Sequence, residues 1–172
     1  MSSEDEEYKA FLRRRRSIRR YTQEQITNAE LNDLMEIASL AASAMNEQAW
    51  YFAVIQNEEI IQAMGELSGL DNPYYGAPTL IAAFARQDAI ASVIDTTLAV
   101  SNMMNTAVAD GLGTCFIYCT KDLFNDPRHA ELRSTCGVPD GYECIGSIVV
   151  GHPAEEVEEP QDRNQNIYSI IR

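Results

Sequence analysis

The feature of this chain that most constrains its fold is a continuous apolar run at residues 79–84, Thr-Leu-Ile-Ala-Ala-Phe, which follows a Gly-Ala-Pro turn. A strand with apolar side chains on both faces is stable only at the centre of a sheet that is covered on both sides. The next stretch, residues 89–109, is rich in Ala, Val, Met and Leu, and its main charge is Asp95. A helix this apolar must be buried, either in a core or at a subunit interface. The two segments together predict a layered fold around a central strand.

The remaining segments alternate between helical and strand patterns. Strands are predicted at residues 50–55, 114–118 and 142–150, and helices at residues 5–15, 27–41 and 57–64, with a short helical region at 126–133. Thr27 and Glu30 have the spacing of a capping box, which predicts the start of the second helix. This mixture indicates the α+β class, or α/β by looser criteria, with three or four strands in one central sheet. We expect a single domain, residues 1–172, with an acidic, irregular tail from about residue 153.

The charges of the chain are unevenly distributed. Its formal net charge is −13, from 26 acidic and 13 basic residues, yet six of the basic residues lie between Arg13 and Arg20. Six clustered positive charges repel one another unless an anionic partner offsets the repulsion. Nucleic acid is not expected as that partner, because most of this acidic surface would repel it. A small phosphorylated ligand or an internal salt-bridge role remains.

Several features bear on compartment and metal binding. No apolar run approaches the length of a membrane span, and the acidic, polar N-terminus is the reverse of a signal peptide. We therefore expect a cytoplasmic protein with no membrane partner. The four cysteines show no ligand pairs with zinc-site spacing, so we expect no metal and reduced, mostly buried thiols: Cys115, Cys119, Cys136 and Cys144.

Five short motifs occur in order along the chain. They are Arg-Arg-Ser-Ile-Arg-Arg-Tyr at 15–21, Ala-Ser-Ala-Met-Asn-Glu-Gln-Ala-Trp at 42–50, Gly-Ala-Pro at 76–78, Gly-Leu-Gly-Thr-Cys at 111–115 and Val-Val-Gly-His-Pro at 149–153. Together they resemble the nitroreductase family of flavin mononucleotide (FMN) enzymes over most of the chain. Ala42 and Ala49 stand where the family usually has proline, which loosens a turn but removes no ligand-binding group. The tail is also more acidic than is usual in the family.

The resemblance implies a nitroreductase-like fold, with a central mixed or antiparallel sheet flanked by helices and the long apolar helix at a homodimer interface. It implies an FMN-dependent oxidoreductase that takes a hydride from NADH or NADPH at the flavin N5. A nitroaromatic, a quinone or a related acceptor is then reduced in the same pocket by a ping-pong cycle. The chemistry belongs to the flavin, so no side chain need act as a catalytic acid or base. A flavin-binding or storage protein with little turnover is the alternative.

The resemblance also implies roles for particular residues. Arg15 and Ser17 would bind the FMN phosphate, and Arg16 would belong to the same cofactor site. Arg19 would reach the pyrimidine edge of the flavin and raise its reduction potential, and Arg163 would close on the phosphate. The segment that holds Ser43, Ala44 and Asn46 would meet the flavin bound mainly by the other chain of the dimer. The backbone of Phe116 and Ile117 would face the flavin N5.

The residues by themselves allow plainer roles. The arginines could simply neutralise an acidic surface, and Arg163 could be a surface residue of the tail. Ser43 and Asn46 could form a helix C-cap or an Asx-turn. Trp50, the only tryptophan of the chain, is expected in the core rather than as a stacking partner.

Overall fold

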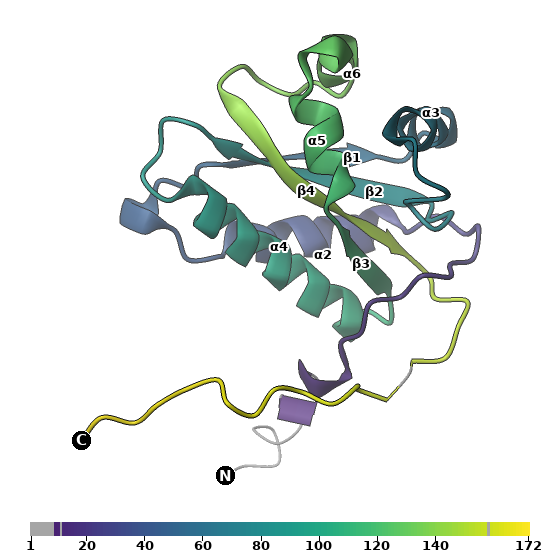
Figure 1. Ribbon diagram of the computed structural model, residues 1–172. Coiled ribbons are helices and arrows are strands. Elements are labelled where there is room, and N and C mark those ends of the chain that lie inside the picture. Colours follow the sequence, from purple (N-terminus) through teal and green to yellow (C-terminus); the bar gives the residue numbers. More distant parts are fainter. Residues whose placement is uncertain (1–8, 11, 158) are drawn as a thin grey trace.

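The computed structural model of the protein describes residues 9–10, 12–157 and 159–172 (Figure 1). Its centre is a four-stranded sheet in the order β1-β2-β4-β3, in which every neighbouring pair is antiparallel. The strands are β1 (Trp50–Ile55), β2 (Thr79–Arg86), β3 (Gly113–Ile117) and β4 (Tyr142–Gly151). The α+β class is confirmed, and of the mixed and antiparallel alternatives the sheet is antiparallel.

Helices cover both faces of this sheet. Helices α2 (Asn28–Ser39) and α4 (Ser92–Ala109) lie on one face, and α3 (Glu58–Ser68), α5 (Cys119–Asn125) and α6 (Ala130–Thr135) lie on the other (Figure 1). Two short 3-10 turns, η1 (Ala44–Asn46) and η2 (Pro127–His129), join these elements. Among the helices of the described residues, none combines the length and apolarity needed to cross a membrane.

Strand β2 is buried on both faces, as the apolar run at 79–84 predicts. Leu80 and Phe84 point into the core under α3 and α5, and Ile81 points into the core under α2 and α4. All three side chains have no exposed surface. The ring of Phe84 meets Phe124 of α5 edge-on, with centroids 5.1 Å apart. Two hydrophobic cores, one on each side of the sheet, therefore hold the layers together.

The predicted start of α2 is confirmed at the level of single hydrogen bonds. The Thr27 hydroxyl accepts from the backbone N–H of Glu30, and the Glu30 carboxylate accepts from the backbone N–H of Thr27. Helix α4 begins at Ser92 rather than Ala89, because the chain from Arg86 to Ala91 first makes a turn. Trp50 is half-buried and packs against the core under α2 and α4.

Helix α5 lies outside the sequence-based prediction, which placed a helical region at 126–133. That prediction is confirmed, because η2 and α6 occupy this range, and the structure adds the seven helical residues of α5 before them. A helix of seven residues is too short to show a clear helical period, and burial of Leu123 and Phe124 against the sheet stabilises it. The helix predicted at 5–15 falls partly outside the described residues; residues 9, 10 and 12–14 are helical.

One buried carboxylate ties η1 to α4. Asp95 lies in the first turn of α4 and is 3 % exposed. Its Oδ2 accepts a hydrogen bond from the backbone N–H of Ala44 at 3.1 Å. The positive end of the helix dipole also favours a carboxylate at this position. Asp95 therefore fixes the position of the turn that carries Ser43, Ala44 and Asn46.

We predict that Asp95→Ala lowers the free energy of unfolding by about 1.5–3 kcal/mol, because it removes a hydrogen bond to a charged group and leaves the Ala44 N–H without its acceptor. Asp88→Ala is the matched control, since Asp88 forms a surface ion pair with Arg86 and its side chain is 82 % exposed. Urea denaturation of the two variants measures the difference. Equal losses of unfolding free energy in Asp95→Ala and Asp88→Ala would show that the Asp95 hydrogen bond does not stabilise the fold.

Candidate functional site

The arginine segment, residues 13–20, runs in extended form beside the edge strand β3 once its helical residues end. The backbone N–H of Ile18 donates to the Thr114 carbonyl at 2.9 Å, and Ser17 forms a parallel bridge with Thr114. Further along, Tyr21 forms an antiparallel bridge with Pro153. The segment thus covers the outer edge of β3, where backbone groups would otherwise lack partners.

Two glycines make room for the side chains at this edge. A Cβ added to Gly113 would lie 2.8 Å from the Cβ of Ile18, so only glycine lets the arginine segment approach β3 this closely. Gly146 of β4 has a φ of +142°, and a Cβ there would lie 2.6 Å from the Phe116 ring. Both positions therefore require glycine for the site to form.

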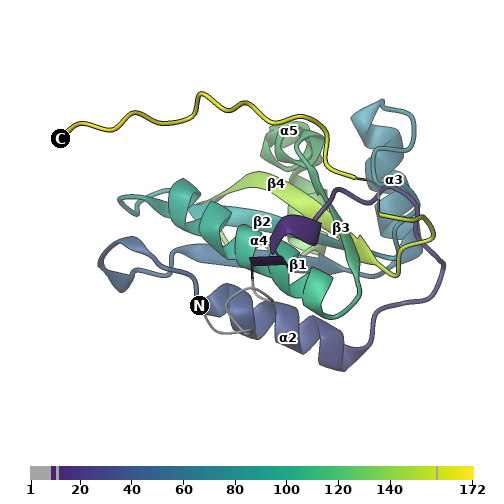
Figure 2. The same ribbon diagram turned by 90° about the horizontal axis from the view of Figure 1, so that it is seen from below.

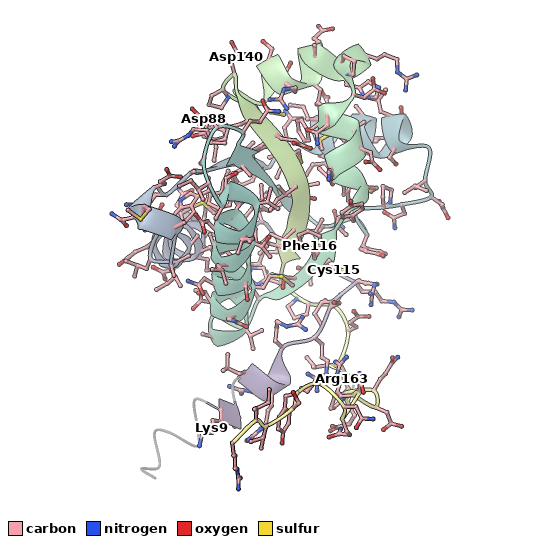
Figure 3. All side chains as sticks on the ribbon, turned by 60° about the vertical axis from the view of Figure 1, so that its left-hand side comes forward. Lys9, Asp88, Cys115, Phe116, Asp140 and Arg163 are labelled. Carbon is pink, nitrogen blue, oxygen red and sulfur yellow. The ribbon has the colours of Figure 1, made fainter. Side chains whose placement is uncertain are left out.

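Three predicted site residues lie near Cys115 of β3. Cys115 is buried, and burial raises the pKa of its thiol, whereas Arg19, Ser17 and Arg15 act on that pKa in the opposite direction. Ser17 therefore lies close to this sulfur, and the charges of Arg15 and Arg19 lie near enough to act on it. Figure 3 labels Cys115 and Phe116 next to each other on this strand. Arg15 and Ser17 are half-buried and Arg19 is exposed, so this region is open to a ligand.

Two residues at this point lie outside the sequence-based prediction. The Arg19 guanidinium lies 5.8 Å from the centre of the Tyr75 ring, and its pKa is raised first by a hydrogen bond with Tyr75 and then by Cys115. Tyr75 has a left-handed backbone, with φ of 56°. The backbone N–H of Arg19 donates to Oε1 of Glu155 at 2.6 Å. The sequence offered one clue to these two residues, which is their position beside recognised motifs. Tyr75 precedes the Gly-Ala-Pro motif, and Glu155 follows Gly-His-Pro.

Arg16 has a different environment from Arg15. Its Nη1 donates to the backbone carbonyls of Arg13 and Arg15, both at 2.7 Å. Its Nε is buried without a partner in the described part of the chain, and so is the hydroxyl of Thr114. Arg13, Arg14 and Arg16 line a cleft of about 420 Å³ between the segment, the end of α4 and the start of the tail.

A larger cavity, of about 500 Å³, lies between α3 and the loop that precedes β2. Among the described residues that line it there are two carboxylates and no arginine or lysine. Its polar side chains are Gln23, Gln25, Gln56, Glu58, Gln62, Glu66, Asn72 and Tyr74. This lining has nothing to attract a phosphate, so the arginine segment is the better candidate for an anionic cofactor.

Ser43, Ala44 and Asn46 lie far from the arginine segment within one chain. Ala44 is bonded to Asp95 in the first turn of α4, whereas Ser17 meets β3 just beyond the last turn of α4. Eighteen helical residues span about 27 Å. Figures 1 and 2 show η1 and the arginine segment at opposite ends of this helix. A single chain therefore does not bring the two groups together.

The backbone around η1 is strained. Met45, Asn46 and Gln48 all have positive φ, at 52°, 59° and 46°. Helix α2 has already ended at Ser39, so Ser43 and Asn46 are not its C-caps. The Ser43 hydroxyl accepts from the backbone N–H of Gln48 within the turn. Left-handed non-glycine residues cost energy and gather at binding sites, so this turn is a second candidate surface.

The tail after β4 extends away from the layers (Figures 1 and 2). Arg163 is exposed on it, and Figure 3 shows Arg163 apart from Cys115 and Phe116. Within one chain, Arg163 therefore lies away from Cys115 and Phe116 on β3. Large apolar side chains of this tail are also exposed: Val157, Ile167, Tyr168, Ile170 and Ile171.

The four cysteines are free thiols. Cys115 and Cys144 are buried, and Cys119 and Cys136 are half-buried. Within the described ranges, no three histidine, cysteine, aspartate or glutamate side chains gather closely enough to hold a metal ion. The chemistry of the candidate site therefore rests on its arginines, hydroxyls and backbone groups.

Comparison with known proteins identifies the family to which the chain belongs. The family model described as the nitroreductase family matches residues 12–73 and 69–152. The chain belongs to the nitroreductase family.

Individual relatives agree with this assignment. The chain is 28 % identical over 156 residues to a protein of Archaeoglobus fulgidus named as an NADH dehydrogenase/NAD(P)H nitroreductase, which covers 87 % of this chain and 88 % of that protein. The fold of this chain matches the crystal structure of a nitroreductase with bound FMN from Bacteroides fragilis, with a TM-score of 0.87 and 23 % identity. The match covers 96 % of this chain and 99 % of that chain. An FMN-bound nitroreductase from Desulfitobacterium hafniense matches with a TM-score of 0.85, 22 % identity and coverage of 96 % and 98 %.

We predict that Gly113→Ala lowers the free energy of unfolding by about 1–3 kcal/mol, because the new methyl group would force Ile18 away from β3. Gly65→Ala is the control: it lies inside α3, and its nearest neighbouring atom would be 3.8 Å away. Alanine at that helical position should be neutral or stabilising by up to about 1 kcal/mol. Chemical denaturation measures both variants, and a destabilised Gly65→Ala with an unaffected Gly113→Ala would contradict the close packing of the segment.

Proposed function

We propose that the protein is an FMN-dependent oxidoreductase that moves a hydride equivalent from NADH or NADPH to a small organic acceptor, such as a nitroaromatic or a quinone. FMN is its cofactor. The observation that carries the proposal is the docking of the segment that holds Arg15, Ser17 and Arg19 on the edge of β3, through the Ile18 N–H bond to Thr114 and the bridge of Ser17 with Thr114. Membership of the nitroreductase family and the NAD(P)H-related name of the Archaeoglobus relative support it.

The donor groups at the arginine segment suit FMN. A phosphate monoester carries close to two negative charges near neutral pH, and arginine binds it with paired, charge-assisted hydrogen bonds. Arg15 and Ser17 would hold this phosphate, and Arg19 would reach the flavin edge. The unpartnered Arg16 Nε and Thr114 hydroxyl leave further polar capacity where the segment meets β3. Arg163 would add a positive charge once the tail packs against a neighbouring surface.

When bound, FMN supplies a ring that accepts and returns a hydride at N5. The chain itself binds and orients. The edge of β3 would present the backbone of Phe116 and Ile117 to the ring, and Phe116 is 39 % exposed there. The nicotinamide and the acceptor would use the same space in turn, which gives ping-pong kinetics. The four free thiols suit a reducing compartment such as the cytoplasm.

We predict that the purified protein carries about one FMN per chain, bound non-covalently. Arg15→Ala should weaken FMN binding by tenfold or more, since a hydrogen bond to a charged group contributes about 1.5–3 kcal/mol. Arg13→Ala is the matched control, because Arg13 is exposed in the same segment. Heat release with mass spectrometry identifies the flavin, and a fluorescence titration compares the variants. Bound FAD, or equal losses in both variants, would contradict the assigned phosphate site.

We propose that the functional unit is a homodimer with shared flavin sites. Large apolar side chains are exposed on or just before the first half of α4, near the end of α2 and on η1: Ile37, Leu40, Met45, Ile90, Val93, Ile94 and Leu98. Burial of these side chains against their symmetry mates is favourable and self-complementary. Pairing would also place the η1 turn of one chain near the arginine segment of the other, which a single chain keeps at opposite ends of α4.

We predict that Ile94→Glu, which puts a charge among the exposed apolar side chains of α4, converts the dimer to a monomer and lowers FMN occupancy with it. Ile94 is 66 % exposed in the single chain, so the monomer should still fold. Leu67→Glu is the control, because Leu67 is 51 % exposed on α3. Light scattering and flavin absorbance measure both properties. A monomer that retains FMN and oxidises NADH or NADPH would contradict the shared site.

A flavin-binding or storage protein is the second candidate function. It is favoured by Tyr118, which is 61 % exposed directly after β3 and whose ring faces the ammonium group of Lys121 at 5.7 Å. A bulky side chain here would fill part of the space that a substrate needs. Steady-state oxidation of NADH and NADPH, with and without a quinone or nitroaromatic acceptor, separates the two functions.

A further inference from the structure

The arginine segment is held from two sides. On one side, the Ile18 N–H donates to the Thr114 carbonyl of β3 at 2.9 Å. On the other, the next N–H along the chain, that of Arg19, donates to the Glu155 carboxylate at 2.6 Å. The Ala154 N–H also donates to the Arg20 carbonyl at 2.8 Å. The first residues of the tail therefore form the outer wall of the segment.

Glu155 differs from the other acidic residues that surround it. It is half-buried, whereas the adjacent Glu156 is exposed. Its partner is a backbone N–H, and a carboxylate makes a shorter and stronger hydrogen bond to such a donor than a neutral carbonyl does. Arg19 and Glu155 are 136 positions apart in the sequence, so this bond joins the two ends of the domain.

Glu155 also sets the local charge. Its carboxylate is held at the backbone of Arg19, the residue whose guanidinium brings a positive charge to the open side of the site. The pKa of Arg19 is raised mainly by Tyr75 and Cys115, with Glu155 as a further contributor. A ligand at this position therefore meets a positive charge that is partly balanced by a fixed negative one.

We propose that Glu155 is a positioning residue of the flavin site: its carboxylate fixes the backbone of the arginine segment and offsets part of the charge that Arg19 presents to the cofactor. This inference rests on the proposed function, because it takes FMN as the ligand. It assigns Glu155 two separable effects. The hydrogen bond organises the segment for FMN binding, and the negative charge opposes the arrival of electrons on the flavin and so lowers its reduction potential.

Two substitutions separate these effects. Glu155→Gln removes the charge but keeps an oxygen that can accept from the Arg19 N–H. Glu155→Ala removes both charge and acceptor. Glu156→Gln and Glu156→Ala are the matched controls, since they change the net charge of the same tail at an exposed position. The FMN dissociation constant is measured by fluorescence titration of the apoprotein, and the flavin midpoint potential by spectroelectrochemistry of the loaded protein.

We expect Glu155→Ala to weaken FMN binding by about tenfold or more, given the usual strength of a hydrogen bond to a charged group. We expect Glu155→Gln to weaken it less, and both variants to shift the potential to more positive values. Arg19→Ala should shift the potential in the opposite direction. The two Glu156 variants should change neither quantity. A merely structural role for Glu155 would not move the potential of the well-folded Glu155→Gln protein.

Unchanged potentials in both Glu155 variants, or matched losses in the Glu155 and Glu156 variants, would overturn the inference while wild-type FMN binding stands. Wild-type protein that binds no FMN would overturn the proposed function and this inference together. Thermal unfolding of each apoprotein identifies a variant that fails to fold, and Glu155→Gln then decides the charge effect by itself.

Discussion

Contact between Ile18 and Gly113 determines whether the candidate site exists. Ile18 is 5 % exposed and anchors a segment whose neighbouring side chains are mostly charged. Because Gly113 has no side chain, the backbone of the segment can approach β3 closely enough to bond with Thr114. One buried apolar residue thereby holds several like charges at the edge of the sheet. If this contact were lost, the segment would no longer be held against β3, and repulsion among its arginines would favour a looser arrangement.

The charge of the protein acts locally rather than in bulk. A net charge of −13 would repel a dianionic phosphate, but the arginine segment concentrates six of the thirteen basic residues at one place. Salt screening confines such interactions to about 10 Å at ordinary ionic strength, so a ligand at this edge responds mainly to the segment and to the carboxylate beside it. Glu155 is that carboxylate, and the half-buried position that it occupies is what distinguishes it from the rest of the acidic tail.

Helix α4 separates the two halves of the site. Its buried Asp95 holds the η1 turn at one end, and the chain leaves its other end directly into β3, where the arginine segment docks. A packed helix is rigid, so the two halves cannot approach each other within one chain. Large apolar side chains are exposed on its first half and on the η1 turn, and this supports the proposal that pairing of two chains both buries them and completes the site.

Sequence by itself determined the features that depend on neighbouring residues. The bounds of β1, the capping box of Thr27 and Glu30, and the burial of β2 on both faces each follow from patterns within a few positions. Arg15, Ser17 and Arg19 are also close in sequence, so neighbouring positions reveal their pattern, and the structure places this segment beside β3. Their binding of FMN stays a prediction.

Tertiary structure decided the features that join distant positions. Helix α5 is stabilised by burial of Leu123 and Phe124 rather than by its own seven residues. Arg16 carries the same charge as Arg15, yet its guanidinium bonds to backbone carbonyls of its own segment. The bond from Arg19 to Glu155 spans 136 positions. Local hydrogen bonds and the hydrophobic period can be recognised from a few neighbouring residues. Long-range contacts such as that of Arg19 with Glu155 exist only because the packed layers bring remote segments together.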